Sequence, residues 1–217
     1  MKKILSMLTV MTLLLPTFGV SFAETKITFK EFSDVTSTHW AISYINFLSS
    51  EEIIAGYPDG TFKPESNVKV NEFITMAMKS LGYAFESKSS DWAKPYIDKA
   101  IELGVIEDRE FDSYTANITR EQMASIAGNS IAITEPRMGN QLDGYIKVEV
   151  KDYHTITGYY IQDVLESYKW GLVGGFPDGT FRPKSNATRA QACVVLNKMQ
   201  EKETRSPFTP DKIGRAS

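Results

Sequence analysis

Apolar residues recur at intervals of three and four over several stretches of the chain, which is the spacing of one face of an α-helix. The first stretch predicts a helix over about residues 40–50, and the next predicts a helix that ends at Gly82. Similar stripes follow later, so we expect a mainly α-helical fold. The expected core positions include Ala41, Tyr44, Ile45, Leu48, Phe73, Ile74, Ala77, Met78, Met123, Ile126, Ala127, Ile131, Val195, Leu196 and Met199.

The chain also contains an internal repeat. Residues 56–67 have the sequence GYPDGTFKPESN and residues 175–186 have GFPDGTFRPKSN, identical at nine of twelve positions with an offset of 119. A more divergent copy lies between them, in which Trp40 recurs as Trp92 while residues 108–114 replace the loop. Together with the helical stripes, this predicts three helix–loop–helix copies.

The repeated loop carries turn residues. Pro58 presets one backbone dihedral of the turn and Gly60 permits a positive φ. The phenylalanines that follow, Phe62 and Phe181, are expected to pack into the core. The ligand series of a calcium-binding EF-hand loop is missing, so we do not expect calcium there.

The N-terminal residues have the pattern of a secretory signal. Lys2 and Lys3 precede an apolar stretch over residues 4–15, and the Ser-Phe-Ala sequence that ends at Ala23 fits a cleavage site. The apolar stretch is too short to span a bilayer, so we expect export and no membrane segment after cleavage. The predicted divisions are a signal peptide (1–23), repeats at 30–84, 85–140 and 146–202, and a flexible tail (203–217). A strand-like run from Tyr145 to Val150 joins the last two repeats.

Composition narrows the class of protein. The chain is 42% hydrophobic and 24% charged, with a formal net charge of −3. Removing the predicted signal would leave an even more acidic chain, which argues against a nucleic-acid partner. The single cysteine, Cys193, lies in a helical apolar stripe and is expected to be buried, and the two histidines are far apart. We find no metal-ligand set, no cofactor motif and no acid–base pair, so we expect no enzyme.

Two arginines stand at predicted helix starts. In Thr119–Gln122 and Thr188–Gln191, Thr and Gln three residues apart before an apolar run form a capping box. Arg120 and Arg189 then occupy the first helical position, where the helix dipole is already positive. An anion bound between the arginine and the helix end would explain this placement, and a solvated surface arginine is the alternative. The sequence leaves both open.

Trp40 and Trp92 each follow a polar residue at a predicted helix start, and Tyr159 aligns with them. A repeated tryptophan can anchor a core. It can also stack on a sugar ring at the mouth of a groove while its indole N–H finds a polar partner.

These motifs in combination resemble the S-layer homology (SLH) family. The resemblance rests on the opening residues Phe32 to Val35, on His39-Trp40-Ala41, on the GYPDGTFKP loop and on the two Thr-Arg segments, and it covers about residues 30–200. It implies three repeats in a pseudo-threefold arrangement around a central helical bundle. It also implies grooves between repeats that bind secondary cell-wall polysaccharide, often carrying pyruvate ketals, and a location at the cell wall or S-layer of a bacterium.

By motif position, the resemblance implies glycan-binding residues. Arg120 and Arg189 would face the acidic substituent of the sugar. Val70 replaces the arginine in the first repeat, where Lys69 beside it is a candidate substitute. Because the repeats differ in this way, we expect unequal grooves. The remaining groove candidates are Asp34, Trp40, Trp92, Gly56 and Gly175.

Two other functions remain as alternatives. The module can act as a structural element of an S-layer, or dock other surface proteins without binding glycan directly. Catalysis by a wall hydrolase is a third possibility, which the missing acid–base pair argues against.

Overall fold

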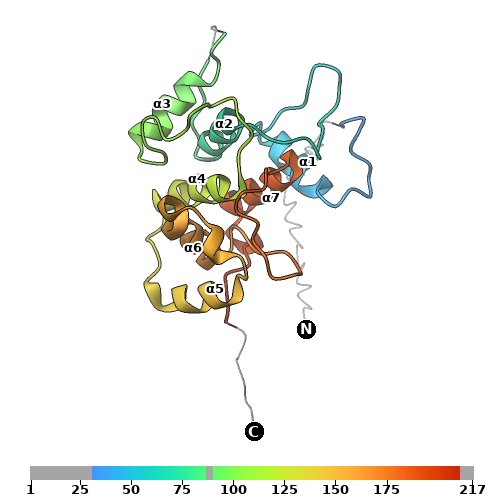
Figure 1. The fold of residues 1–217 in the computed structure, drawn as a ribbon. Coiled ribbons are helices and arrows are strands. Elements are labelled where there is room, and N and C mark those ends of the chain that lie inside the picture. The colour runs from blue at the N-terminus through green and yellow to red at the C-terminus, as the bar shows by residue number, and fades with distance from the viewer. Residues whose placement is uncertain (1–30, 87–89, 211–217) are drawn as a thin grey trace, which may run out of the picture.

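The computed structural model describes residues 31–86 and 90–210, which form seven α-helices and no strand (Figure 1). The mainly α-helical prediction is confirmed, whereas the predicted signal peptide lies outside the described residues. The strand predicted at Tyr145 to Val150 is wrong, because these residues belong largely to helix α5. The helices are α1 (Ile42–Ser50), α2 (Val70–Ser80), α3 (Lys94–Glu102), α4 (Arg120–Ala132), α5 (Asp143–Glu149), α6 (Ile161–Lys169) and α7 (Arg189–Gln200).

A closed triangle of backbone hydrogen bonds lies at the centre of the fold. The Val68 amide donates to the Ala187 carbonyl, the Ala187 amide to the Ile118 carbonyl, and the Ile118 amide to the Val68 carbonyl, each over 3.0 Å. All three residues are fully buried. Each comes from a different repeat and immediately precedes the second helix of that repeat. The triangle therefore holds the repeats around a pseudo-threefold axis.

The helices follow the same cyclic order. The second helices of the repeats, α2, α4 and α7, contact one another at the centre. Each first helix packs on the second helix of the preceding repeat, so α3 lies on α2, α6 on α4 and α1 on α7 (Figure 1). The contact between α1 and α7 joins the two ends of the chain and closes the ring. The expected apolar faces are buried by this packing, with Tyr44 half-buried, and so are Cys193 and the two loop phenylalanines.

The two matching loops have matching internal bonds. The Asp59 carboxylate accepts hydrogen bonds from the Thr61 amide at 3.0 Å and the Thr61 hydroxyl at 2.6 Å. Asp178 accepts from the amide and hydroxyl of Thr180 at 2.9 and 2.6 Å. Gly60 has a φ of +81°, as the turn prediction requires. These aspartates therefore shape the loops, and the bonds from Thr61 lower the pKa of Asp59.

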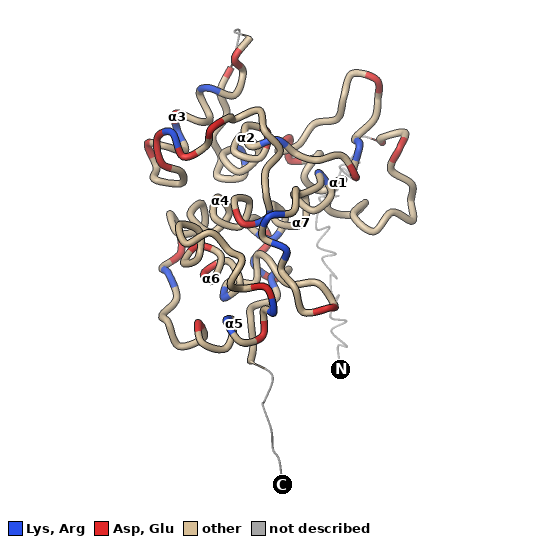
Figure 2. Tube along the Cα trace, in the orientation of Figure 1, with Lys and Arg blue, Asp and Glu red and all other residues tan. Residues whose placement is uncertain are grey.

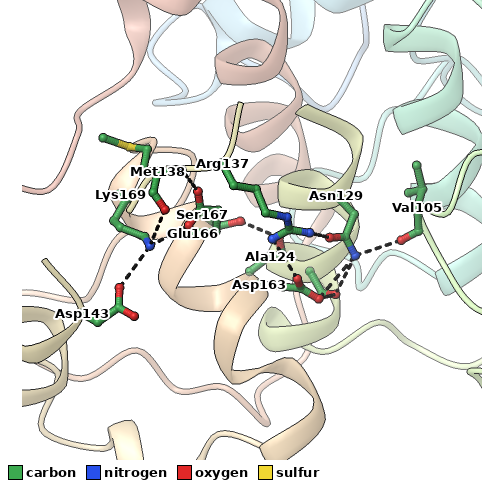
Figure 3. A network of polar contacts seen from close by, with 11 residues as sticks. Val105, Ala124, Asn129, Arg137, Met138, Asp143, Asp163, Glu166, Ser167 and Lys169 are labelled. Carbon is green, nitrogen blue, oxygen red and sulfur yellow. Dashed lines mark hydrogen bonds and ion pairs between the residues drawn. The ribbon is translucent and has the colours of Figure 1, made fainter. Parts of the chain in front are cut away.

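A segment that has no counterpart in the other repeats joins α4 to α6. It contains α5 and is held to α6 by Lys169, whose side chain is 2% exposed and whose Nζ lies 2.6 Å from Glu166 Oε2 and 3.0 Å from Asp143 Oδ1 (Figure 3). Glu166 in turn accepts a hydrogen bond from the Met138 amide. The local alternation of apolar and polar residues predicted a strand here. The residues form a helix because α5 packs on α6, and this buried ion pair joins the two.

Residues beyond α7 also lie against the body of the protein. The Arg205 guanidinium is buried and pairs with Glu135 at 2.8 Å. The Phe208 amide donates to the Tyr168 carbonyl at 3.3 Å. Residues 205–208 of the predicted tail are thus bonded to the repeats.

Candidate functional site

The structure contains a groove at each junction between repeats. The first groove, between repeats 1 and 2, has a volume of about 470 Å³ and the third, between repeats 3 and 1, about 300 Å³. Each is built from the loop and second helix of one repeat, an aromatic residue from the next repeat and an arginine from the remaining one. Arg189 and Trp92 line the first groove, and Arg120 and Trp40 line the third. Gly56 and Gly175 form part of the two loop walls.

The guanidinium of Arg120 is held in a fixed orientation. Its Nε donates to the Phe181 carbonyl over 2.8 Å and its Nη2 to the Gly174 carbonyl over 3.0 Å. The rings of Phe176 and Phe181 lie 4.7 and 4.9 Å from its central carbon. The residue is 8% exposed, and this burial lowers the pKa of Arg120. The alternative of a solvated surface arginine is therefore wrong.

Arg189 has the same geometry in the first groove. Its Nε donates to the Phe62 carbonyl over 2.8 Å and its Nη2 to the Ala55 carbonyl over 2.9 Å. The rings of Tyr57 and Phe62 lie 5.0 and 4.5 Å away. Among the described residues, neither this arginine nor Arg120 has a carboxylate in ion-pair range. Both grooves therefore present an oriented cation whose charge the protein does not neutralise.

The helix ends themselves are not open to an anion. The capping boxes at Thr119 and Thr188 are confirmed. The amides of Arg120 and Arg189 donate to the carbonyls of Ser185 and Ser66, each over 2.9 Å. Since a neighbouring repeat supplies these acceptors, the idea of an anion between each arginine and its own helix end is wrong. The arginine side chains instead extend away from the helix ends into the grooves.

The two tryptophans stand at the groove mouths. Trp40 is 56% exposed and Trp92 is 44% exposed, so neither anchors the core. Tyr159, which aligns with them, is 51% exposed beside the second groove. Exposed aromatic faces beside an oriented cation suit the stacking of a sugar ring that carries an acid.

Two lysines that the sequence analysis missed complete the grooves. Lys79 of α2 lines the first groove and Lys198 of α7 lines the third. Lys198 has no partner among the described residues, and burial lowers its pKa. Their spacing of 119 residues, which equals the offset between the loops, was the signal that would have found them.

Two other candidates lie elsewhere. Both carboxylate oxygens of Asp34 are used inside the first loop, where they accept the amides of Phe62 and Lys63 at 2.7 Å. Asp152 makes the equivalent bonds in the third repeat. Lys69 is exposed, lines no groove and precedes the first helical residue of α2. Asp34 is therefore a structural residue in this structure, and Lys69 does not replace the missing arginine.

The second groove, between repeats 2 and 3, has a different chemistry. Val70 stands at the position of the arginines, and Asn129 at the position of the two lysines. Arg137, from the segment before α5, enters this groove, where its guanidinium donates to Asn129 Oδ1 at 2.6 Å and to Asp163 Oδ1 at 3.3 Å (Figure 3). The second groove keeps a volume of about 290 Å³, close to that of the third, so Arg137 changes the chemistry of its lining and does not close it.

Charged groups elsewhere do not form a single patch. Figure 2 shows acidic and basic positions interspersed along the trace. The described residues contain no group of three or more histidine, cysteine, aspartate or glutamate side chains placed to hold a metal ion. None of the helices in residues 31–86 and 90–210 combines the length and apolar character needed to cross a bilayer. The grooves thus combine a concave surface with charged side chains.

The S-layer homology domain family matches residues 31–69, 86–124 and 151–193, more than half of the chain. This chain belongs to the S-layer homology family. It is similar to an endoglucanase of Bacillus sp. (strain KSM-635), with 31% identity over 208 residues, 90% of this chain and 22% of that protein. It is also similar to the middle cell wall protein of Brevibacillus brevis, with 31% identity over 66% of this chain and 13% of that protein. A cellulosome-anchoring protein of Acetivibrio thermocellus is 26% identical over 82% of this chain and 27% of that protein.

The SLH chain therefore spans about a quarter or less of these relatives. Since the match to the endoglucanase covers only 22% of it, the name of that relative brings no activity to this chain. What the relatives share with it is the SLH region. The family and these relatives support a non-catalytic anchoring module at the bacterial cell surface.

Proposed function

We propose that this chain attaches to the bacterial cell wall by binding acidic secondary cell-wall polysaccharide in its first and third grooves. One observation carries the proposal. Each of these grooves places an oriented guanidinium without a carboxylate partner beside a lysine and below an exposed tryptophan. A guanidinium binds a carboxylate through two parallel hydrogen bonds, and an indole face stacks on a pyranose ring.

The lysine in the third groove supports this in its own right. An ammonium group that is partly buried without a counter-ion has given up hydration for no protein partner. A carboxylate bound beside Arg120 would compensate the ammonium group for this lost hydration. An acidic substituent such as a pyruvate ketal has the charge and the small size that this corner of the groove accepts.

The second groove contributes no glycan site in this proposal. Glu107, Glu110 and Asp163 line it with Arg137 as the cation, and an acidic sugar would meet three carboxylates there. The protein thus has two glycan sites on one rigid ring. Weak binding at each site is then sufficient for stable attachment, because the second site binds at a high effective concentration once the first is occupied.

The test is sedimentation with purified wall sacculi. We expect the protein to sediment with intact sacculi and to remain in solution after the secondary polymer has been stripped. A variant with Arg120→Lys and Arg189→Lys should bind less, because lysine keeps the charge but loses the paired geometry. Arg109→Ala removes an exposed arginine outside the grooves and serves as the control. Equal binding to stripped sacculi would overturn the proposal and favour lattice assembly or docking of a surface protein.

A further inference from the structure

The first and third grooves are not equivalent, although they share the arginine, the lysine and the tryptophan. Three positions on their helix walls differ, and one of them, Met76 against Val195, exchanges one apolar side chain for another. Thr75 of α2 corresponds to Val194 of α7, and Glu72 corresponds to Gln191. The pairs are related by the same offset of 119 residues as the loops.

Thr75 carries a hydroxyl group that the protein leaves without a partner. The residue is 8% exposed and lines the first groove, and its Oγ1 is buried with no hydrogen bond among the described residues. A buried hydroxyl without a partner is unfavourable, and valine has the same shape without this group. The third groove has that valine. A bound group that donates to or accepts from Thr75 would remove the penalty in the first groove only.

The two grooves also differ in charge and in size. Lys79 donates to the Glu52 carbonyl at 3.0 Å, and Glu72 adds a negative charge to the first groove. Lys198 has no such bond, and Gln191 is neutral. The first groove is therefore less cationic, and it is also the larger of the two. Aromatic rings of Phe85, Trp92 and Tyr96 line it.

We propose that the two grooves select different parts of an acidic polysaccharide. The first groove binds an acidic sugar together with a hydroxyl substituent of the same ring, which bonds to Thr75. The third groove binds the acidic substituent and makes no such bond. This inference rests on the proposed function, since it assigns specificity to the same sites.

The test uses the chain labelled with 5-fluorotryptophan. The three tryptophans give three fluorine signals: Trp92 reports the first groove, Trp40 the third, and the buried Trp170 is an internal reference. The probes are the pyruvate ion and methyl glucoside carrying pyruvate as a 4,6-ketal. We expect Thr75→Val to weaken the glucoside titration at Trp92 by about two- to tenfold, the loss of one hydrogen bond, and to leave the Trp40 titration unchanged.

Two comparisons separate specificity from folding. Val194→Thr should strengthen glucoside binding at Trp40, and neither variant should change the titration with pyruvate alone, which lacks the ring substituents. Since Thr75→Val removes an unpaired buried hydroxyl, its melting temperature should not fall. An unchanged Trp92 titration in Thr75→Val, with glucoside binding intact, overturns the inference and leaves the proposed function standing. If neither Trp40 nor Trp92 responds to either probe, both fail.

Discussion

The Arg137 guanidinium lies 2.6 Å from Asn129 Oδ1 in the second groove. Asn129 occupies the helix position at which the other two grooves have lysine. Asp163, which also accepts from Arg137, replaces the tyrosine found at the equivalent position as Tyr96. The second groove thus lacks the arginine and the lysine that the repeats place in the other two grooves. The cation that lines it, Arg137, comes from the inserted segment. Pseudo-threefold symmetry of the backbone does not extend to the chemistry of the grooves.

A binding stoichiometry of two follows for an acidic monosaccharide probe. Replacing Arg137 by Gln should leave wall binding within about twofold of the unaltered protein, because both proposed glycan sites lie in the other two grooves. Calorimetric titration measures the stoichiometry, and sedimentation with sacculi measures wall binding. A third site, or a clear loss of wall binding in Arg137→Gln, would contradict the assignment of the second groove.

Truncating a groove arginine should lower stability as well as binding. Arg120→Ala leaves the Phe181 and Gly174 carbonyls without their donors, at a cost of about 1–3 kcal/mol. Urea denaturation measures this cost, and binding must then be compared well below the melting temperature. The exposed Arg109→Ala should change the free energy of unfolding little. Unchanged stability in Arg120→Ala would mean that the two carbonyls are satisfied in another way.

The third groove should lose affinity in alkaline solution at a lower pH than an ordinary lysine would predict. Burial lowers the pKa of Lys198, so its positive charge disappears before that of exposed lysines as pH rises. A bound anion stabilises the charged form, so binding raises this pKa and weakens as pH rises through it. The Trp40 fluorine signal, titrated with pyruvate across the alkaline range, measures the effect. Lys198→Arg should shift the loss of affinity to higher pH, and an unshifted profile would exclude Lys198 as the group responsible.

In the unliganded protein the lowered pKa of Lys198 has the opposite effect, because it makes the free energy of unfolding rise with pH. Between the lowered pKa of Lys198 and the ordinary lysine value, the unfolded chain binds the extra proton. The contribution of Lys198 to the free energy of unfolding therefore rises with pH through this window. Lys198→Met should remove this component, which denaturation at several alkaline pH values detects. An identical pH dependence in both proteins would show that Lys198 is not desolvated in solution.

The inserted segment should depend on one buried cation. Lys169→Met leaves the Glu166 and Asp143 carboxylates without a counter-ion and should cost about 3–5 kcal/mol of stability. Hydrogen exchange should show loss of protection in α5 before the central helices. Lys94→Met, which breaks the exposed pair with Asp98, is the matched control and should have no measurable effect. Comparable stability of the two variants would mean that the segment is held by its apolar contacts alone.

The sequence by itself determined the repeat, its helices and the two special arginines. The spacing of Ile45 and Leu48 or of Met123 and Ile126 encodes a buried helix face, because a helix repeats every 3.6 residues whatever surrounds it. The capping box at Thr119 is equally local, since all of its bonds lie within four residues. The recurring GYPDGTF loop identified the copies directly.

Only the tertiary structure decided which residues share a groove. Arg189 and Trp92 line one groove because α1 packs on α7, α3 packs on α2 and the central triangle of backbone bonds closes the three repeats into a ring. No local pattern encodes that closure, since its bonds join residues from different repeats. The helical state of α5 and the place of Arg137 have the same origin: both depend on contacts between α6 and the inserted segment, in which Lys169 pairs with Asp143 and Glu166 accepts from the Met138 amide.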